Sequence, residues 1–111
     1  MKKPDNLHDV AYLYKAGAEA YAEGHVEKAL NYIEQVLKKD PKHTMAWTLK
    51  GNCLDLSGKY EEALESYDTA FKLDPSDPDI LFSKAETLEK MGREKDAKET
   101  MDKAVKLDLK E

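Results

Sequence analysis

AWTLKGNCLDLSGKYEEALESYDTAFKLDP, residues 46–75, contains two amphipathic helical patterns that are joined at Gly58 and closed by Asp74-Pro75. A similar arrangement of helical patterns and turn residues recurs about 34 residues earlier and later in the chain. In each unit a glycine separates the two helical patterns and an aspartate follows the second: Gly24 and Asp40, Gly58 and Asp74, Gly92 and Asp108. A fixed period of this size is the signature of stacked repeats. The sequence therefore predicts an all-α chain of six helices, arranged as three helix–turn–helix units.

The composition fits one helical domain. The chain has 111 residues, of which 37% are charged and 41% hydrophobic, with few glycines and prolines. Its net charge of -5 argues against nucleic acid as a partner. It has no secretory signal pattern and no apolar run long enough for a membrane span, so a membrane partner is not expected. Cys53 is the only cysteine, which favours a reducing compartment, and we expect a cytoplasmic protein.

Helix boundaries follow from apolar spacing and from capping residues. The first unit is predicted to contain helices over residues 10–23 and 26–38. Thr44 is the predicted N-cap of the third helix. Asp77 is the predicted N-cap of the fifth, because proline at the next position favours a helix start.

Trp47, Gly51, Ala63, Ala70 and Pro75 form the pattern W-x3-G-x11-A-x6-A-x4-P, which resembles a tetratricopeptide repeat. The resemblance implies a single domain, a right-handed superhelical α-solenoid, after a short lead-in. The lead-in is residues 1–9 of the chain, and the domain, residues 10–111, divides into repeats 10–43, 44–77 and 78–111.

Small residues at the same place in each unit let its two helices approach closely. Gly17, Gly51 and Ala85 are expected to face Ala29, Ala63 and Ala97, respectively. The chain also departs from the family pattern. Lys50 and Lys84 stand where leucine is usual, so their side chains must snorkel or lie at an edge.

In this family the first helix of each unit lines a concave face that holds an extended peptide or a partner helix. The matching positions are Ala11, Tyr14, Ala18, Tyr21, Met45, Thr48, Asn52, Asp55, Asp79, Phe82, Glu86 and Glu89. The resemblance thus implies a groove that is aromatic at its start and acidic at its end. Such a groove would prefer a segment with apolar anchors followed by basic residues. Asn52 is the first candidate for pairing with a peptide backbone.

Plainer interpretations of these residues stay open. Tyr14, Tyr21 and Phe82 are equally compatible with core filling. For Glu86 and Glu89 a solvated helix face is the favoured interpretation.

A carboxylate clamp for acidic chaperone tails is not expected. Family members with that function carry a set of lysine, asparagine and arginine residues. This chain has Tyr14, Ala18, Leu49, Asp79 and Ser83 at the matching positions.

No residue pattern supports catalysis, a metal site or a cofactor. His8, His25 and His43 lack ligand spacing. Cys53 has apolar helical neighbours and is interpreted as a buried filler. We therefore expect that the protein is not an enzyme.

The sequence favours a protein–protein interaction scaffold that binds a peptide or partner helix in its groove. The alternative is a structural self-assembly unit that forms homo-oligomers through an uncapped C-terminal repeat. The apolar surface predicted for that alternative consists of Leu88, Met101, Ala104 and Val105.

Overall fold

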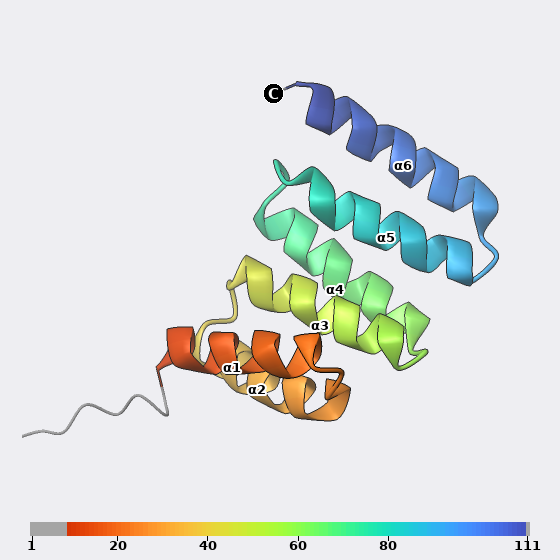
Figure 1. Cartoon of the computed structure of the whole chain (residues 1–111). Coiled ribbons are helices and arrows are strands. Elements are labelled where there is room, and N and C mark those ends of the chain that lie inside the picture. Colours follow the sequence, from red (N-terminus) through yellow and green to blue (C-terminus); the bar gives the residue numbers. More distant parts are fainter. Residues whose placement is uncertain (1–8, 111) are drawn as a thin grey trace, which may run out of the picture.

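The computed structural model describes residues 9–110, and this range is built from α-helices without any strand (Figure 1). The helices are α1 Val10–Ala22, α2 Val26–Lys39, α3 Thr44–Leu56, α4 Tyr60–Leu73, α5 Pro78–Lys90 and α6 Glu94–Leu109. The predicted all-α class and the six predicted helices are confirmed. Most of the lead-in, residues 1–8, lies outside the described residues, as does Glu111.

The turn inside each helix pair depends on a glycine. Gly24, Gly58 and Gly92 have φ values of 84°, 78° and 79°, the left-handed region that residues with a Cβ rarely adopt. The three recurring glycines therefore let each chain reversal take the same form.

Of the two predicted N-caps, one is confirmed and one is wrong. Asp77 caps α5 as predicted, because its carboxylate accepts a hydrogen bond from the Asp79 backbone N–H at 2.9 Å. The N-cap of α3 is His43 and not Thr44. The His43 Nδ1 atom accepts the Ala46 N–H at 3.1 Å, and Thr44 is the first helical residue.

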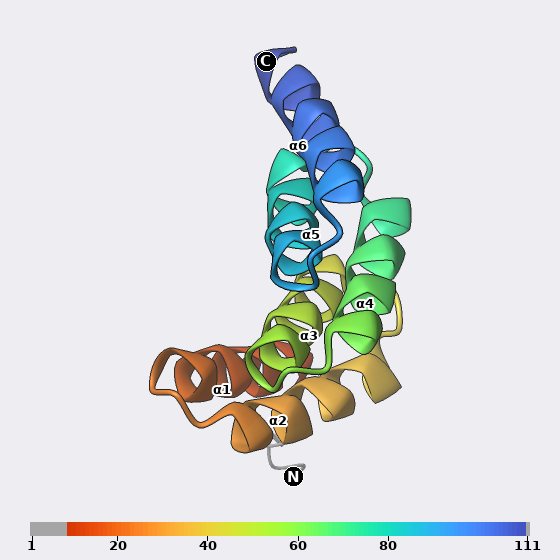
Figure 2. The same cartoon turned by 90° about the vertical axis from the view of Figure 1, so that its right-hand side faces the viewer.

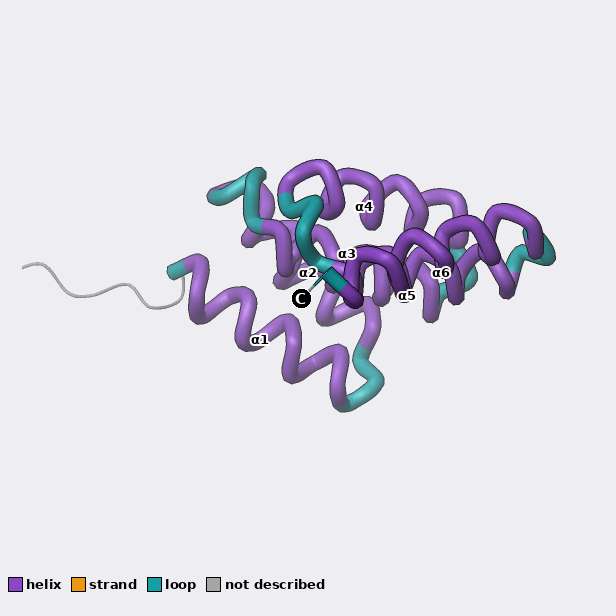
Figure 3. Tube along the Cα trace, turned by 90° about the horizontal axis from the view of Figure 1, so that it is seen from above, coloured by secondary structure: helices purple, strands orange, loops and turns teal. Residues whose placement is uncertain are grey.

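The helices stack so that the first helix of each pair lies on the inner side. α1 contacts α3 and α3 contacts α5, whereas the outer helices α2, α4 and α6 make no contact with one another. The stack therefore curves, and its concave face is lined by α1, α3 and α5 (Figure 2). Seen from above, α1 and α4 lie on opposite sides of the stack (Figure 3).

Each of the first two pairs contains one very close approach. A Cβ added at Gly51 would lie 2.6 Å from Cε1 of Tyr67 on α4, and one at Gly17 would lie 3.0 Å from Cδ1 of Ile33 on α2. The nearest side chains are thus Tyr67 and Ile33, and not the expected Ala63 and Ala29. The larger residues reach across the interface, while the two alanines lie elsewhere in the same core.

The two unusual lysines make equivalent ion pairs across the junctions between units. Lys50 lies 3.6 Å from the Glu34 carboxylate on α2, and Lys84 lies 2.7 Å from the Asp68 carboxylate on α4. Lys50 also lies 5.2 Å from the centre of the Trp47 ring. Partly exposed pairs of this kind contribute about 1 kcal/mol or less, so they help to set the register more than the stability.

Replacing Gly51 by alanine is expected to destabilise the protein. The gain of about 1 kcal/mol in helix propensity is smaller than the cost of about 1–3 kcal/mol for overpacking against the Tyr67 ring. Gly17→Ala should be milder, because it meets the flexible end of Ile33. Urea unfolding of both variants measures the difference.

The Tyr67→Leu background provides the control. It removes the ring, so the additional loss caused by Gly51→Ala should shrink there. An increase in the free energy of unfolding of Gly51→Ala in the native background would contradict the predicted clash.

Candidate functional site

Three aromatic side chains on the helices that line the concave face are only partly covered. Tyr14 and Tyr21 on α1 and Phe82 on α5 are half-buried. The Tyr14 ring stacks on His43 with the ring centres 5.1 Å apart, and burial raises the pKa of its hydroxyl. Tyr14 therefore both packs against α3 and keeps part of its surface exposed. Met45 is more open, with 60% of its surface exposed.

Tyr67 brings a polar group from α4 to the concave side. Its side chain is 2% exposed, and its hydroxyl donates a hydrogen bond to Asn52 Oδ1 at 2.6 Å. This bond orients the Asn52 amide so that its Nδ2 group points away from Tyr67. Burial is the main reason why the pKa of Tyr67 is raised. Tyr67 was not among the residues predicted for the site; its place opposite Gly51 was the signal that could have found it.

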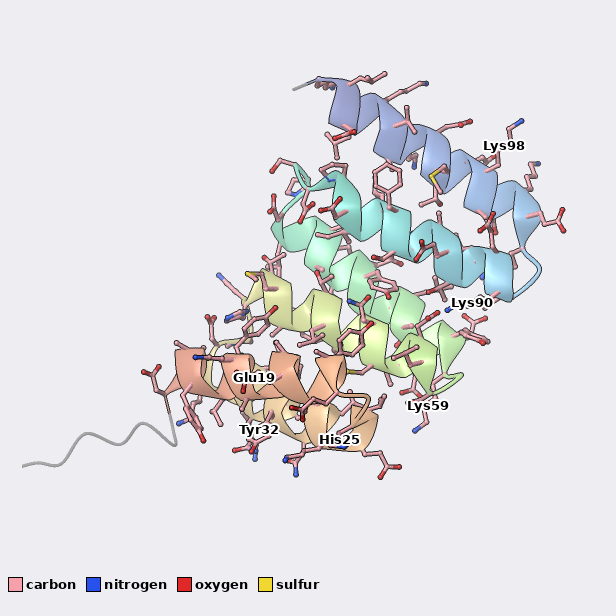
Figure 4. All side chains as sticks on the ribbon, viewed as in Figure 1. Glu19, His25, Tyr32, Lys59, Lys90 and Lys98 are labelled. Carbon is pink, nitrogen blue, oxygen red and sulfur yellow. The ribbon has the colours of Figure 1, made fainter. Side chains whose placement is uncertain are left out.

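Asp55 is held by two residues of the next unit. Its carboxylate accepts a hydrogen bond from the Thr87 hydroxyl at 2.7 Å and one from the Lys90 ammonium at 2.5 Å. The hydrogen bond to Asp55 is the main cause of the raised Lys90 pKa. Figure 4 shows Lys90 between the turn that carries Lys59 and the helix that carries Lys98. Asp55 therefore joins α3 to α5, and Lys90 offsets its charge.

Thr87 and Lys90 were also missed as site residues. Both follow Asp55 by about one repeat length, which places them on the neighbouring inner helix. That spacing was the available signal, although a repeat length alone does not show which side chains meet.

Residues from all three inner helices converge at this point. The pKa of Tyr21 on α1 is raised first by burial and then by Cys53, Asp55 on α3 and, more weakly, Glu86 on α5. Glu86 and Glu89 are exposed, as are Ala11 and Asp79, and Ala18 is half-buried. The Thr48 hydroxyl donates to the Thr44 carbonyl at 3.1 Å, so this hydrogen bond stays within α3.

The predicted oligomer face is wrong at two of its four residues. Leu88 is 2% exposed and Ala104 is fully buried, because α5 and α6 pack against each other. Leu88 belongs to a core cluster with Leu64 and Ala97. Val105 is 43% exposed and Met101 is half-buried.

The outer face of α6 is also more polar than the equivalent face of α4. Glu94 and Lys98 occupy the positions that Tyr60 and Leu64 have one unit earlier. Covering α6 with another apolar helix would therefore desolvate charged groups.

The described residues contain no group of three or more His, Cys, Asp or Glu side chains placed to hold a metal ion. Within residues 9–110, each helix is too short or too polar to cross a bilayer. Cys53 is buried as interpreted from the sequence, and burial raises the pKa of its thiol to about 11. The reactive thiolate is therefore disfavoured at neutral pH.

Stacked helix pairs with a partly exposed aromatic and acidic inner face define a helical-repeat scaffold. Two tetratricopeptide repeat profiles match the chain, over residues 14–78 and residues 56–111. The protein belongs to the tetratricopeptide repeat family. This membership supports a role in protein–protein interaction.

Comparisons with individual proteins show similarity in sequence to one protein and in fold to others. The uncharacterized protein MJ0572 of Methanocaldococcus jannaschii is 38% identical over 56 residues, which are 50% of this chain and 65% of that protein. A structure of MamA superposes with a TM-score of 0.86 at 22% identity, over 93% of this chain and 59% of MamA. The chain thus spans less than two thirds of the length of either protein.

A second structural match is SycD, the type III secretion translocator chaperone of Yersinia enterocolitica, in an alternative dimer. It gives a TM-score of 0.86 at 24% identity. The match covers 88% of this chain and 74% of SycD. At such identities the likeness of MamA and SycD establishes the shared fold alone.

Ionisation of buried Tyr67 is expected to destabilise the fold at alkaline pH. Its pKa is higher in the folded protein than in the unfolded chain, where a tyrosine titrates at about 10. Its contribution is therefore complete below that pH and is lost as the pH rises toward the folded-state pKa, by about 1.4 kcal/mol per pH unit. The free energy of unfolding in urea should fall less steeply above pH ~10 in Tyr67→Phe than in the native protein.

Tyr12→Phe is the matched control, because Tyr12 is 41% exposed on α1. In both variants the free energy of unfolding should still fall somewhat with rising pH. The reason is that the pKa values of Tyr14, Tyr21 and Cys53 are raised too. Equal alkaline slopes for Tyr67→Phe and Tyr12→Phe would contradict the role assigned to Tyr67.

Proposed function

We propose that this protein is an interaction scaffold whose concave face binds an extended peptide or one helix of a partner. The observation that supports the proposal is the combination of partly exposed aromatic side chains and exposed carboxylates along the inner helices. Tyr14, Tyr21 and Phe82 supply apolar contact area, and Glu86 and Glu89 supply negative charge. The partner segment then has apolar anchors followed by basic residues.

The aromatic residues are suitable anchors because packing in the folded protein already restricts the conformations of their side chains. Tyr14 is held by its stacking on His43, and Tyr21 is partly buried among residues of α3. A partner that packs against them loses little additional side-chain entropy from the scaffold. Exposed Met45, in the first turn of α3, adds an adaptable apolar surface.

Asn52 supplies the polar contact of the groove. Its Oδ1 atom is occupied by the Tyr67 hydroxyl, so its Nδ2 group is the part that can donate to a peptide carbonyl. Asp55 has less charge to offer a partner than an unpaired carboxylate, since it is bound by Thr87 and Lys90. The basic residues of the partner are therefore assigned to Glu86 and Glu89.

Self-assembly through the last repeat is the second candidate. Val105 and Leu109 on α6 are exposed apolar residues, which favours a contact with another copy. Glu94 and Lys98 on the same helix oppose it, because their charges would have to be desolvated. Sedimentation over a concentration series distinguishes the two functions: a stable monomer at all concentrations would eliminate self-assembly.

The groove is tested with an array of peptides that combine two apolar residues with three lysines or arginines. Binding of the best peptide should weaken by about tenfold or more in Tyr14→Ala and in Glu86→Lys, as measured by fluorescence anisotropy. Raising the salt concentration should weaken binding to the native protein and have less effect on Glu86→Lys.

Two control variants lie outside the proposed groove. Tyr12→Ala removes an exposed tyrosine from the same helix, and Glu99→Lys reverses a charge in the cleft between α4 and α6. Both should keep the native affinity. If Tyr14→Ala and Glu86→Lys also keep it, the concave face is not the binding surface.

A further inference from the structure

A second recess lies outside the set of concave residues, where the C-terminal ends of α4 and α6 meet the beginning of α5. It has a volume of about 300 Å³. Its apolar floor is formed by Phe71, Pro75, Leu81 and Leu107, and its rim by Lys103, Lys106 and Lys110. We refer to these seven residues as the lysine-rimmed pocket.

The pocket occurs where the chain departs from its own repeat. Leu81 occupies the position that Trp47 has one unit earlier, and Pro75 corresponds to Pro41. At the earlier junction the indole N–H of Trp47 donates a hydrogen bond to the Pro41 carbonyl at 2.7 Å. Leucine is smaller than tryptophan and has no N–H to make the equivalent bond to Pro75.

Phe71 fills only part of the space that the smaller Leu81 side chain leaves empty. It stands where the first unit has Leu37, so one side chain of the floor is larger while the other is smaller. The remaining space is bounded by apolar groups on α4, α5 and α6. The first junction thus shows within this protein how an indole is held at such a place, against a proline and beside a lysine.

The rim carries a concentration of positive charge in a chain whose net charge is -5. Lys103, Lys106 and Lys110 lie at spacings of three and four residues and therefore project from one side of α6. The ion pairs found among the described residues do not include these three lysines. Nearby Asp77 is engaged as the N-cap of α5.

We propose that the lysine-rimmed pocket binds an acidic peptide segment through one aromatic side chain, with an indole as the best fit. The aromatic ring fills the space beside Leu81 and donates its N–H to the Pro75 carbonyl. Carboxylates on either side of the ring pair with the lysines of the rim, and a lysine ammonium next to the ring adds a cation–π contact. This partner has the opposite charge to the one assigned to the concave face.

The test uses the labelled pentapeptide Asp-Glu-Trp-Glu-Asp, whose ends are blocked, and measures fluorescence anisotropy together with backbone amide NMR shifts. Leu81→Trp should weaken binding by about tenfold or more, because it fills the pocket with the residue that the previous unit carries. The double variant Lys103→Glu, Lys106→Glu should weaken binding as strongly. In the native protein the largest amide shifts should be at Leu81, Lys106 and Leu107.

Four controls, two peptides and two protein variants, test whether binding is specific to this pocket. A peptide with alanine in place of tryptophan tests the pocket, and Lys-Arg-Trp-Arg-Lys tests the rim; both should bind at least about tenfold more weakly. Lys98→Glu, on a different side of α6, should keep the native affinity. Tyr14→Ala should also keep it, which makes the result independent of the concave face.

Several outcomes would overturn the proposal. These are no binding of the acidic peptide at about 1 mM, equal binding of the alanine peptide, or unchanged affinity in the double lysine variant. If circular dichroism shows that Leu81→Trp does not fold, the affinity of the double lysine variant still tests the proposal. Concentration-dependent association of the native protein that Leu81→Trp abolishes would assign the pocket to a second copy of this chain instead.

Discussion

The contact between Gly51 and the Tyr67 ring is the constraint on which both the packing and the inner face of this protein depend. Because residue 51 has no Cβ, the ring lies directly against α3, at a distance that an alanine methyl group could not share. The ring is buried, yet its hydroxyl reaches Asn52 on the inner side. A single close approach therefore joins α3 to α4 and also orients the Asn52 amide.

The junction between the second and third units is held at two places. On the inner side, Asp55 accepts hydrogen bonds from Thr87 and Lys90; elsewhere along α5, Lys84 pairs with Asp68 of α4. Leu88 adds buried apolar contact at the same junction. The exposed ion pair contributes little stability, whereas an Asp55 carboxylate without its partners would carry a substantial desolvation cost. The curvature of the inner face therefore depends on polar contacts as well as on the core.

The sequence could predict features that each unit imposes on itself. A left-handed turn requires glycine at Gly24, Gly58 and Gly92, so the turns and the six helices were visible in the spacing. Contacts between units were harder to predict, because the repeat length does not specify which side chains meet. The contact of Asp55 with Thr87 was therefore not predicted, and Leu88 was expected to be exposed, although α4 and α6 cover it. His43 was missed as an N-cap because an imidazole is an uncommon cap.

Departures of the chain from its own period are informative for a physical reason. Positions that pack in the same way must keep similar residues, as do Ala63 and Ala97, which are both buried. Where Trp47 gives way to Leu81, or Asn52 to Glu86, the equivalent packing or hydrogen bond cannot be kept. Such a change leaves a recess in one case and an exposed charge in the other. The repeat thus determines the shape of the scaffold, and its exceptions determine the chemistry of its surface.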